Sequence, residues 1–201
     1  YKSMTQITEL ILDEGEDLYG VDAISLVEYP AIEQNFVFLS QEKNKYVFAK
    51  ADDEKKLLVG PALIPNKQIY RMDQETGEEY YAHFSKETIR RVSELYLQKN
   101  NHHNYTYEHE NKVVGLSLFE SWIVDFPDMD KSRAYGFEPK EGWWMVSLKV
   151  HSDELWAKIK SGEVKGFSIE GYFADKIKAS KVFDLASEMD ALIKKLEESK
   201  K

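Results

Sequence analysis

Cysteine is absent from this chain of 201 residues, and long apolar runs are absent as well. Without cysteine the protein has no disulfides, thiol nucleophiles or thiolate metal ligands, which agrees with a reducing cytoplasm. A nucleophilic enzyme of this sequence must therefore use an oxygen nucleophile. No segment approaches the roughly 20 apolar residues of a membrane-spanning helix, and the N-terminus lacks the basic-then-apolar order of a signal peptide. These absences predict a soluble protein that is not exported.

An excess of basic residues is also lacking. The chain has 27 Lys and Arg against 36 Asp and Glu, which gives a net charge of -9. No basic block stands apart from its acidic neighbours, so the sequence predicts no nucleic-acid partner. The hydrophobic fraction of 42% is sufficient for one sizeable core. We expect one compact domain over residues 1–178, followed by an amphipathic helix or linker over 179–201.

The order of predicted elements indicates a mixed fold. A β-rich run over 21–27 predicts a strand, and apolar residues at helical spacing predict a helix over 86–98 that begins after a capping serine. A second, shorter helix is predicted over 153–160, and it leads directly into a strand over 164–173 that is flanked by glycines. Strands interspersed with helices, without a regular βαβ alternation, predict an α+β protein.

One serine has the surroundings that a serine hydrolase needs. Such an enzyme requires a hydroxyl, an imidazole that takes its proton, a third group that orients the imidazole, and backbone N–H groups for the oxyanion. Ser168 lies between Gly166 and Gly171, where missing side chains let a substrate backbone approach. On this spacing alone, a serine on the polar face of an ordinary strand is the better interpretation.

The candidate imidazole is His109, at the end of an aromatic strand between Glu108 and Glu110. A solvated histidine in a polar turn would have the same pattern. His102 and His103 lie nearby and could be metal ligands together with His109. However, adjacent histidines rarely point at one ion, and the spacing matches no compact zinc motif. The sequence therefore favours a polar loop over a metal site.

Three segments carry a resemblance to a known family. They are L-W-A-K-I-K-S-G-E-V-K-G-F-S-I-E-G-Y-F over 155–173, E-H-E over 108–110 with E-S-W-I-V-D over 120–125, and G-P-A-L-I-P over 60–65 with I-Y-R over 69–71 and F-S over 84–85. Together they resemble the prohead (capsid-maturation) serine proteases of tailed phages, in the branch found in defective prophages. The resemblance extends from about residue 21 to residue 173. It implies a fold similar to herpesvirus assemblin, a mostly antiparallel β-barrel-like sheet wrapped by helices.

The resemblance implies that Ser168 is the nucleophile and His109 its general base. The third catalytic residue, which orients the histidine, departs from the family pattern. Many members have a strand resembling V-D-A-x-S-x-V, followed by Pro-Ala, after the nucleophile, and this strand supplies an acidic residue. Here the only match, residues 21–27 with Pro-Ala at 30–31, precedes everything else, and only helix-like sequence follows residue 173. We therefore hypothesise a circular permutation in which Asp22 is the acid. The competing candidates are Asp125, Glu120 and Glu170.

The function implied by the resemblance is that of a serine endopeptidase that cleaves scaffold and major capsid proteins during head maturation. It would act in the cytoplasm of the bacterial host, inside the immature head, without a metal or cofactor, and as a monomer or a homo-oligomer. One alternative is a catalytically inactive module of the same fold that binds scaffold or capsid proteins, a role that the helix predicted near the C-terminus would suit. A second alternative is a metal hydrolase centred on His103 and His109.

Overall fold

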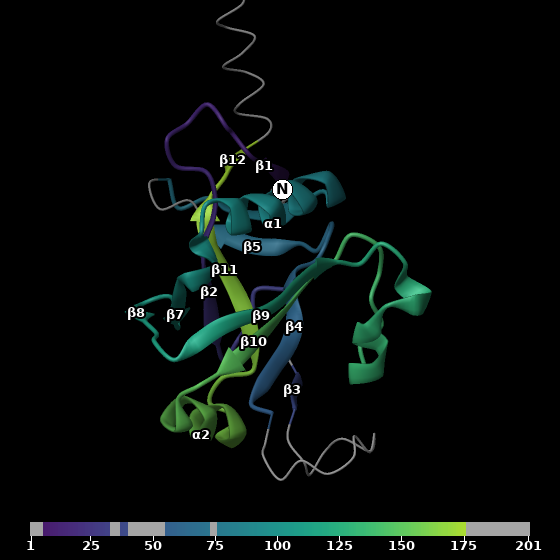
Figure 1. Ribbon diagram of the computed structural model, residues 1–201. Coiled ribbons are helices and arrows are strands. Elements are labelled where there is room, and N and C mark those ends of the chain that lie inside the picture. Colours follow the sequence, from purple (N-terminus) through teal and green to yellow (C-terminus); the bar gives the residue numbers. More distant parts are fainter. Residues whose placement is uncertain (1–5, 33–36, 40–54, 73–75, 176–201) are drawn as a thin grey trace, which may run out of the picture.

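The computed structural model describes residues 6–32, 37–39, 55–72 and 76–175, which form three four-stranded sheets and two α-helices (Figure 1). We name each sheet after one of its inner strands, except the last, which we name after the strand that bears Ser168. The β6 sheet has the order β12 (Ala174–Asp175), β1 (Gln6–Ile11), β6 (Glu79–Phe84) and β5 (Ile69–Met72). The β10 sheet has the order β3 (Val37–Leu39), β4 (Leu57–Leu63), β10 (Trp144–Val150) and β9 (Leu116–Ile123). The β11 sheet has the order β11 (Gly166–Tyr172), β2 (Gly20–Val27), β7 (Tyr105–Tyr107) and β8 (Asn111–Lys112).

Each helix lies in the chain between strands of two different sheets. They are α1 (Lys86–Gln98) and α2 (Asp153–Ser161), with 3₁₀ turns η1 (Asn101–His103), η2 (Pro127–Met129) and η3 (Lys131–Tyr135). Ser85 caps α1 by accepting a hydrogen bond from the Thr88 N–H, as the sequence predicts. Gly162 ends α2 with φ +81, a conformation that favours glycine. Both predicted helices are therefore confirmed within a residue or two of their ends.

The mixture of helices and mostly antiparallel strands is confirmed, but the barrel-like sheet is not. Seven strand pairings are antiparallel, and two, β1 with β6 and β2 with β7, are parallel. Among the described residues the strands form three separate sheets and no closed barrel. β11 lies against β4 without a ladder between them, so the β10 and β11 sheets do not join into one. The barrel-like sheet was an expectation from the family resemblance alone, because strand periodicity predicts which residues are extended and not which strands are neighbours.

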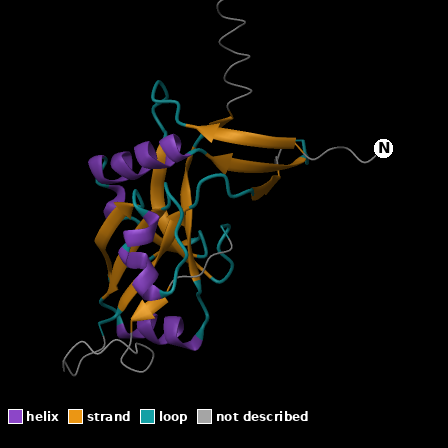
Figure 2. Ribbon diagram, turned by 90° about the vertical axis from the view of Figure 1, so that its right-hand side faces the viewer, coloured by secondary structure: helices purple, strands orange, loops and turns teal. Residues whose placement is uncertain are grey.

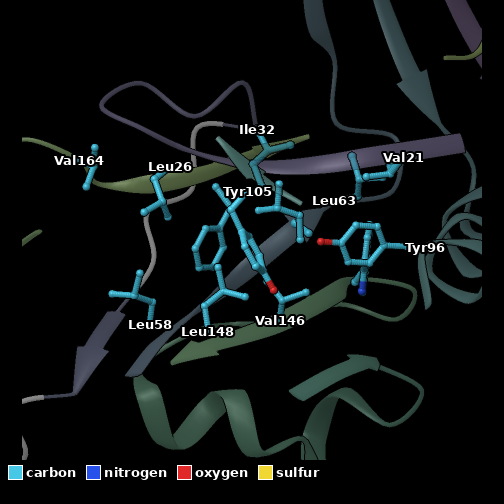
Figure 3. Close-up of a cluster of buried hydrophobic side chains, with 14 of the residues drawn as sticks. Val21, Leu26, Ile32, Leu58, Leu63, Tyr96, Tyr105, Val146, Leu148 and Val164 are labelled. Carbon is cyan, nitrogen blue, oxygen red and sulfur yellow. The ribbon is translucent and has the colours of Figure 1, made fainter. Parts of the chain in front are cut away.

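The main core lies between the β10 and β11 sheets (Figure 3). Leu26 of β2 faces Leu58 of β4 and Leu148 of β10, and all three side chains are fully buried. Tyr105 of β7 extends the same layer. The β6 sheet projects from one end of the molecule (Figure 2). Because successive side chains of a strand point to opposite faces, the residues of β2 and β11 that alternate with these core residues form the outer face of the β11 sheet.

Two sequence predictions reach beyond the described part of the chain. The helix or linker predicted over 179–201 lies outside the described residues, and the domain boundary at 178 stays a prediction. Within the residues that are described, no helix is both long and apolar enough to cross a membrane.

Candidate active site

Ser168 lies on β11, on the outer face of the β11 sheet. Its neighbours in the strand point the other way, since Phe167 and Ile169 belong to the main core. Ser168 pairs in register with Ser25 of β2, and its residue is 7% exposed. Ser168 thus has little access to solvent, although β11 is the edge strand of its sheet in the described part of the chain.

The glycine after this serine has a different role from the one that the sequence suggests. A Cβ atom on Gly171 would lie 2.1 Å from the carbonyl oxygen of Gly20 and 2.9 Å from the Cα of Val21. The glycine is therefore required for the close approach of β2 and β11. The pairing shifts register between Glu170 and Gly171, which leaves Asp22 opposite no single partner, as in a β-bulge.

His109 lies in the turn that joins β7 to β8. Glu108 has φ 50 and His109 has φ 60, so both occupy the left-handed region that non-glycine residues seldom adopt. Three hydrogen bonds hold this turn on β2 and on Glu28, the residue that follows it. The Glu108 N–H donates to the Leu26 carbonyl at 3.0 Å, the His109 N–H donates to Ser25 Oγ at 3.0 Å, and the Glu28 N–H donates to Glu108 Oε1 at 2.6 Å.

The imidazole of His109 contacts the strand that carries Ser168. Nδ1 of the ring lies 3.2 Å from Oε1 of Glu170, which is two residues beyond Ser168 on the same face of β11. The side chains of His109 and Glu170 are 44% and 29% exposed. Thr106 Oγ1 donates a hydrogen bond to the same carboxylate oxygen. A carboxylate at Nδ1 orients the ring and leaves Nε2 for proton transfer, as a serine protease requires.

In the described part of the chain, no hydrogen bond joins the His109 ring to Ser168. Ser168, the His109 ring and Glu170 lie on one face of the β11 sheet, but Ser168 and the imidazole are not hydrogen-bonded in the described residues. Catalytic hydrogen bonds are often long before substrate binds, so this geometry is compatible with the predicted roles of both residues.

Asp22, the acid proposed from the sequence, lies on β2, and among the described residues no hydrogen bond or ion pair joins its carboxylate to the His109 ring. Its backbone carbonyl accepts a hydrogen bond from Asn104 Nδ2 at 3.1 Å. Burial raises the pKa of the Asp22 carboxyl, and the negative charge of Glu170 raises it further, while Lys99 opposes the shift. The two carboxylates are thus near enough to repel each other.

The other two competing acids lie in other surroundings. Asp125 is ion-paired with Arg90 of α1. Glu120 of β9 accepts a hydrogen bond from Lys131 Nζ at 2.6 Å. Of the four acids considered from the sequence, Glu170 is the one whose contact with His109 is seen in the described part of the chain.

The histidines considered as metal ligands do not converge. His102 and His103 lie side by side in η1, with ring centroids 4.2 Å apart. Among the described residues, no group of three or more His, Asp or Glu side chains is arranged to hold a metal ion. The arrangement gives no support to a metal hydrolase centred on His103 and His109.

Two hydroxyl residues of this face were not considered in the sequence analysis. Ser25 of β2 pairs in register with Ser168 on one side and with Thr106 of β7 on the other. Ser168, Ser25 and Thr106 thus form a row of hydroxyls across three strands, which we call the hydroxyl row. The available signal was a serine between apolar residues, Ile24 and Leu26, of the strand at 21–27, because a buried polar side chain needs a partner.

A family model described as "Putative phage serine protease XkdF" matches residues 44–178, more than half of the chain. The matched residues include His109, Ser168 and Glu170, whereas Asp22 and Ser25 precede them. No curated protein and no solved structure matches the chain. The extent of the family match shows that the chain belongs to the family of the phage serine protease XkdF.

Proposed function

We propose that the protein is a serine endopeptidase of phage head maturation, with Ser168 as nucleophile and His109 as general base. The observation that carries the proposal is the contact of 3.2 Å between His109 Nδ1 and Glu170, two residues beyond Ser168. It fixes an imidazole over the strand face that bears the serine. Membership of a phage serine protease family supports the same reaction class.

The mechanism follows from these positions. Nε2 of His109 takes the proton of the Ser168 hydroxyl as Oγ attacks the scissile carbonyl carbon. Backbone N–H groups near Ile169 hold the oxyanion. His109 then gives the proton to the departing amine, which leaves an ester on Ser168. Water, deprotonated by His109, hydrolyses the ester and restores the serine.

Glu170 and Asp22 compete for the role of the group that orients the imidazole. We assign the contact with Nδ1 to Glu170, because its carboxylate oxygen is within hydrogen-bonding distance. Asp22, as the acid of a circularly permuted family strand, is the alternative. It is supported by the position of β2 beside β11. A carboxylate in this role holds the ring and stabilises the imidazolium that forms during the reaction.

The proposed substrates are the scaffold and major capsid proteins of the phage, cleaved inside the immature head in the host cytoplasm. The resemblance to prohead proteases and the family's description as a phage serine protease support this choice. A relation in fold to herpesvirus assemblin belongs to the same proposal.

The test is a cleavage assay with the phage's scaffold and major capsid proteins. We expect wild-type protein to cleave them, Ser168→Ala to abolish cleavage, and Ser117→Ala to leave it unchanged. Ser117 is the matched control because its Oγ lies 2.9 Å from His151 Nε2, so it is a serine with an imidazole at another place in the fold. Cleavage that survives Ser168→Ala would overturn the proposal.

One observation favours the inactive alternative, a module that binds scaffold or capsid proteins without cutting them. Ser168 is 7% exposed, and its hydroxyl is not hydrogen-bonded to His109 in the described part of the chain. Binding of these proteins without cleavage, by wild-type and Ser168→Ala protein alike, is the result that this alternative predicts.

A further inference from the structure

We propose that Ser25 is a positioning residue of the active site, whose hydroxyl fixes the turn that carries the His109 imidazole. This inference rests on the proposed function and adds to it a residue outside the family match. Ser25 Oγ accepts the His109 N–H at 3.0 Å. The same serine is the partner in register of Ser168. One side chain thus lies next to the nucleophile and holds the backbone of the base.

The hydroxyl row explains why this position matters. Residues paired across an antiparallel ladder have Cβ atoms about 4.5–5.5 Å apart, so Ser25 and Ser168 are immediate neighbours on the outer face. On the other side, Thr106 is paired with Ser25 and donates to Glu170. The Ser25 hydroxyl therefore holds the backbone of His109, and the Thr106 hydroxyl holds the Glu170 carboxylate that contacts the His109 ring.

The turn needs such support because of its conformation. Both Glu108 and His109 have positive φ, which is unfavourable for residues with a Cβ atom. The Glu108 N–H is bonded to a backbone carbonyl and does not depend on any side chain of β2. The bond from the His109 N–H does depend on one, and it is the bond at the residue that carries the imidazole.

The burial of Ser25 makes this bond durable. Ser25 is 0% exposed, so water cannot replace its hydroxyl as the acceptor without opening the sheet. If the hydroxyl were removed, the His109 N–H would lose its partner and the turn could relax. Misplacement of a catalytic group by about 1 Å can reduce the rate about 10²-fold.

The experiment compares Ser25→Thr with Ser25→Val. These side chains have nearly the same shape, but threonine keeps the hydroxyl and valine lacks it. Ser25→Ala adds a variant without extra volume. Ser147→Ala is the control, since Ser147 is another buried serine, and its Oγ has no hydrogen-bond partner among the described residues. The readouts are the rate at which a fluorophosphonate labels Ser168, kcat and KM on a scaffold peptide, and hydrogen exchange at the His109 amide.

We expect Ser25→Val and Ser25→Ala to reduce the labelling rate and kcat by about 10²-fold, with KM unchanged. Ser25→Thr and Ser147→Ala should stay near the wild-type rate. The His109 amide should exchange slowly in wild-type protein and in Ser25→Thr, and faster in Ser25→Val. A loss of general stability alone would lower the melting temperature without separating the threonine variant from the valine variant.

Equal labelling and equal exchange in the threonine and valine variants would overturn the inference. So would fast exchange of the His109 amide in wild-type protein, a result that needs no variant to fold. These failures are distinct from failure of the proposed function. If wild-type protein is labelled at Ser168 and Ser25→Val is labelled equally fast, only the role of Ser25 is lost. If Ser168 is not labelled in wild-type protein, the proposed function fails, and the exchange measurement alone decides whether Ser25 holds the turn.

Discussion

At the scale of single residues, the outer face of the β11 sheet brings together an imidazole, a carboxylate and a row of three hydroxyls. A histidine in a left-handed turn contacts a glutamate through its ring, and it contacts a buried serine through its backbone. Left-handed conformations at non-glycine residues cost energy and gather where the structure must hold a group in one position. The strain at Glu108 and His109 thus fits the proposed role of His109 as the base.

The roles of Glu170 and Asp22 can be separated by neutralising each carboxylate in turn. We expect Glu170→Gln to lower kcat by about 10⁴-fold, since the ring loses the group that orients it. Asp22→Asn should have a much smaller effect, because in the described residues no hydrogen bond or ion pair joins Asp22 to the imidazole. Steady-state kinetics on a scaffold peptide measures both. The reverse order of effects would return the orienting role to Asp22.

The raised pKa of Asp22 predicts how stability depends on pH. A carboxyl whose pKa is raised by folding binds its proton more tightly in the folded state. Its ionisation therefore destabilises the fold as the pH rises from the pKa of the unfolded state, about 3.9, through the higher pKa of the folded state. Asp22→Asn removes this penalty. Urea unfolding should show a gain in the free energy of unfolding at pH 7 that shrinks as pH falls toward 4.

Asp153→Asn is the control of opposite sign. Hydrogen bonding to Lys56 lowers the pKa of the Asp153 carboxyl, so its contribution stabilises the fold above the unfolded pKa. Its removal should lower the free energy of unfolding at pH 7, and the loss should shrink at low pH. A gain for Asp22→Asn that is the same at every pH would contradict the account.

At the scale of elements, the pairing of β2 with β11 creates the site. β2 lies near the N-terminus and β11 near the end of the described chain, yet they are direct neighbours in the β11 sheet (Figure 1). The close approach depends on Gly171, whose missing side chain leaves room for the Gly20 carbonyl.

Gly171→Ala should therefore separate the two strands. Its Cβ would meet the backbone of Gly20 at 2.1 Å, and backbone cannot move aside as a flexible side chain can. We expect a loss of at least about 3 kcal/mol in the free energy of unfolding, measured by urea denaturation. Gly15→Ala is the control, because the nearest atom to its Cβ would be the Asp13 carboxylate oxygen at 3.2 Å. Equal stability of the two variants would show that the strands can yield.

Elements set by local sequence were predictable, and those set by distant contacts were not. Helix α1 follows from apolar residues at helical spacing behind the cap Ser85, and α2 from Ser152 and Gly162 at its ends. The parallel pairing of β2 with β7 joins residues about 80 positions apart, and no local pattern specifies it. For the same reason Glu170 could only be one of four candidate acids, and Ser25 was overlooked.

At the scale of the whole molecule, two sheets pack around one core, and the candidate site lies on the outside of one of them. The main core takes the inward side chains of β2 and β11, whereas Ser25, Ser168 and Glu170 lie on the opposite face of the same sheet. A serine–imidazole pair is in the β10 sheet, where Ser117 lies on β9 and His151 directly follows β10. The described part of the chain thus offers two serines to compare. Ser168 lies on the strand whose Glu170 contacts the His109 ring, and Ser117 lies beside His151, so the two sites predict different labelled residues.

Identification of the serine that reacts with a fluorophosphonate tests the central assignment most directly. After labelling of the wild-type protein, mass spectrometry of its peptides should find the phosphonyl group on Ser168, and His109→Ala should reduce that labelling by at least about 10²-fold. Labelling of Ser117 instead, or labelling of Ser168 that does not depend on His109, would contradict the assignment.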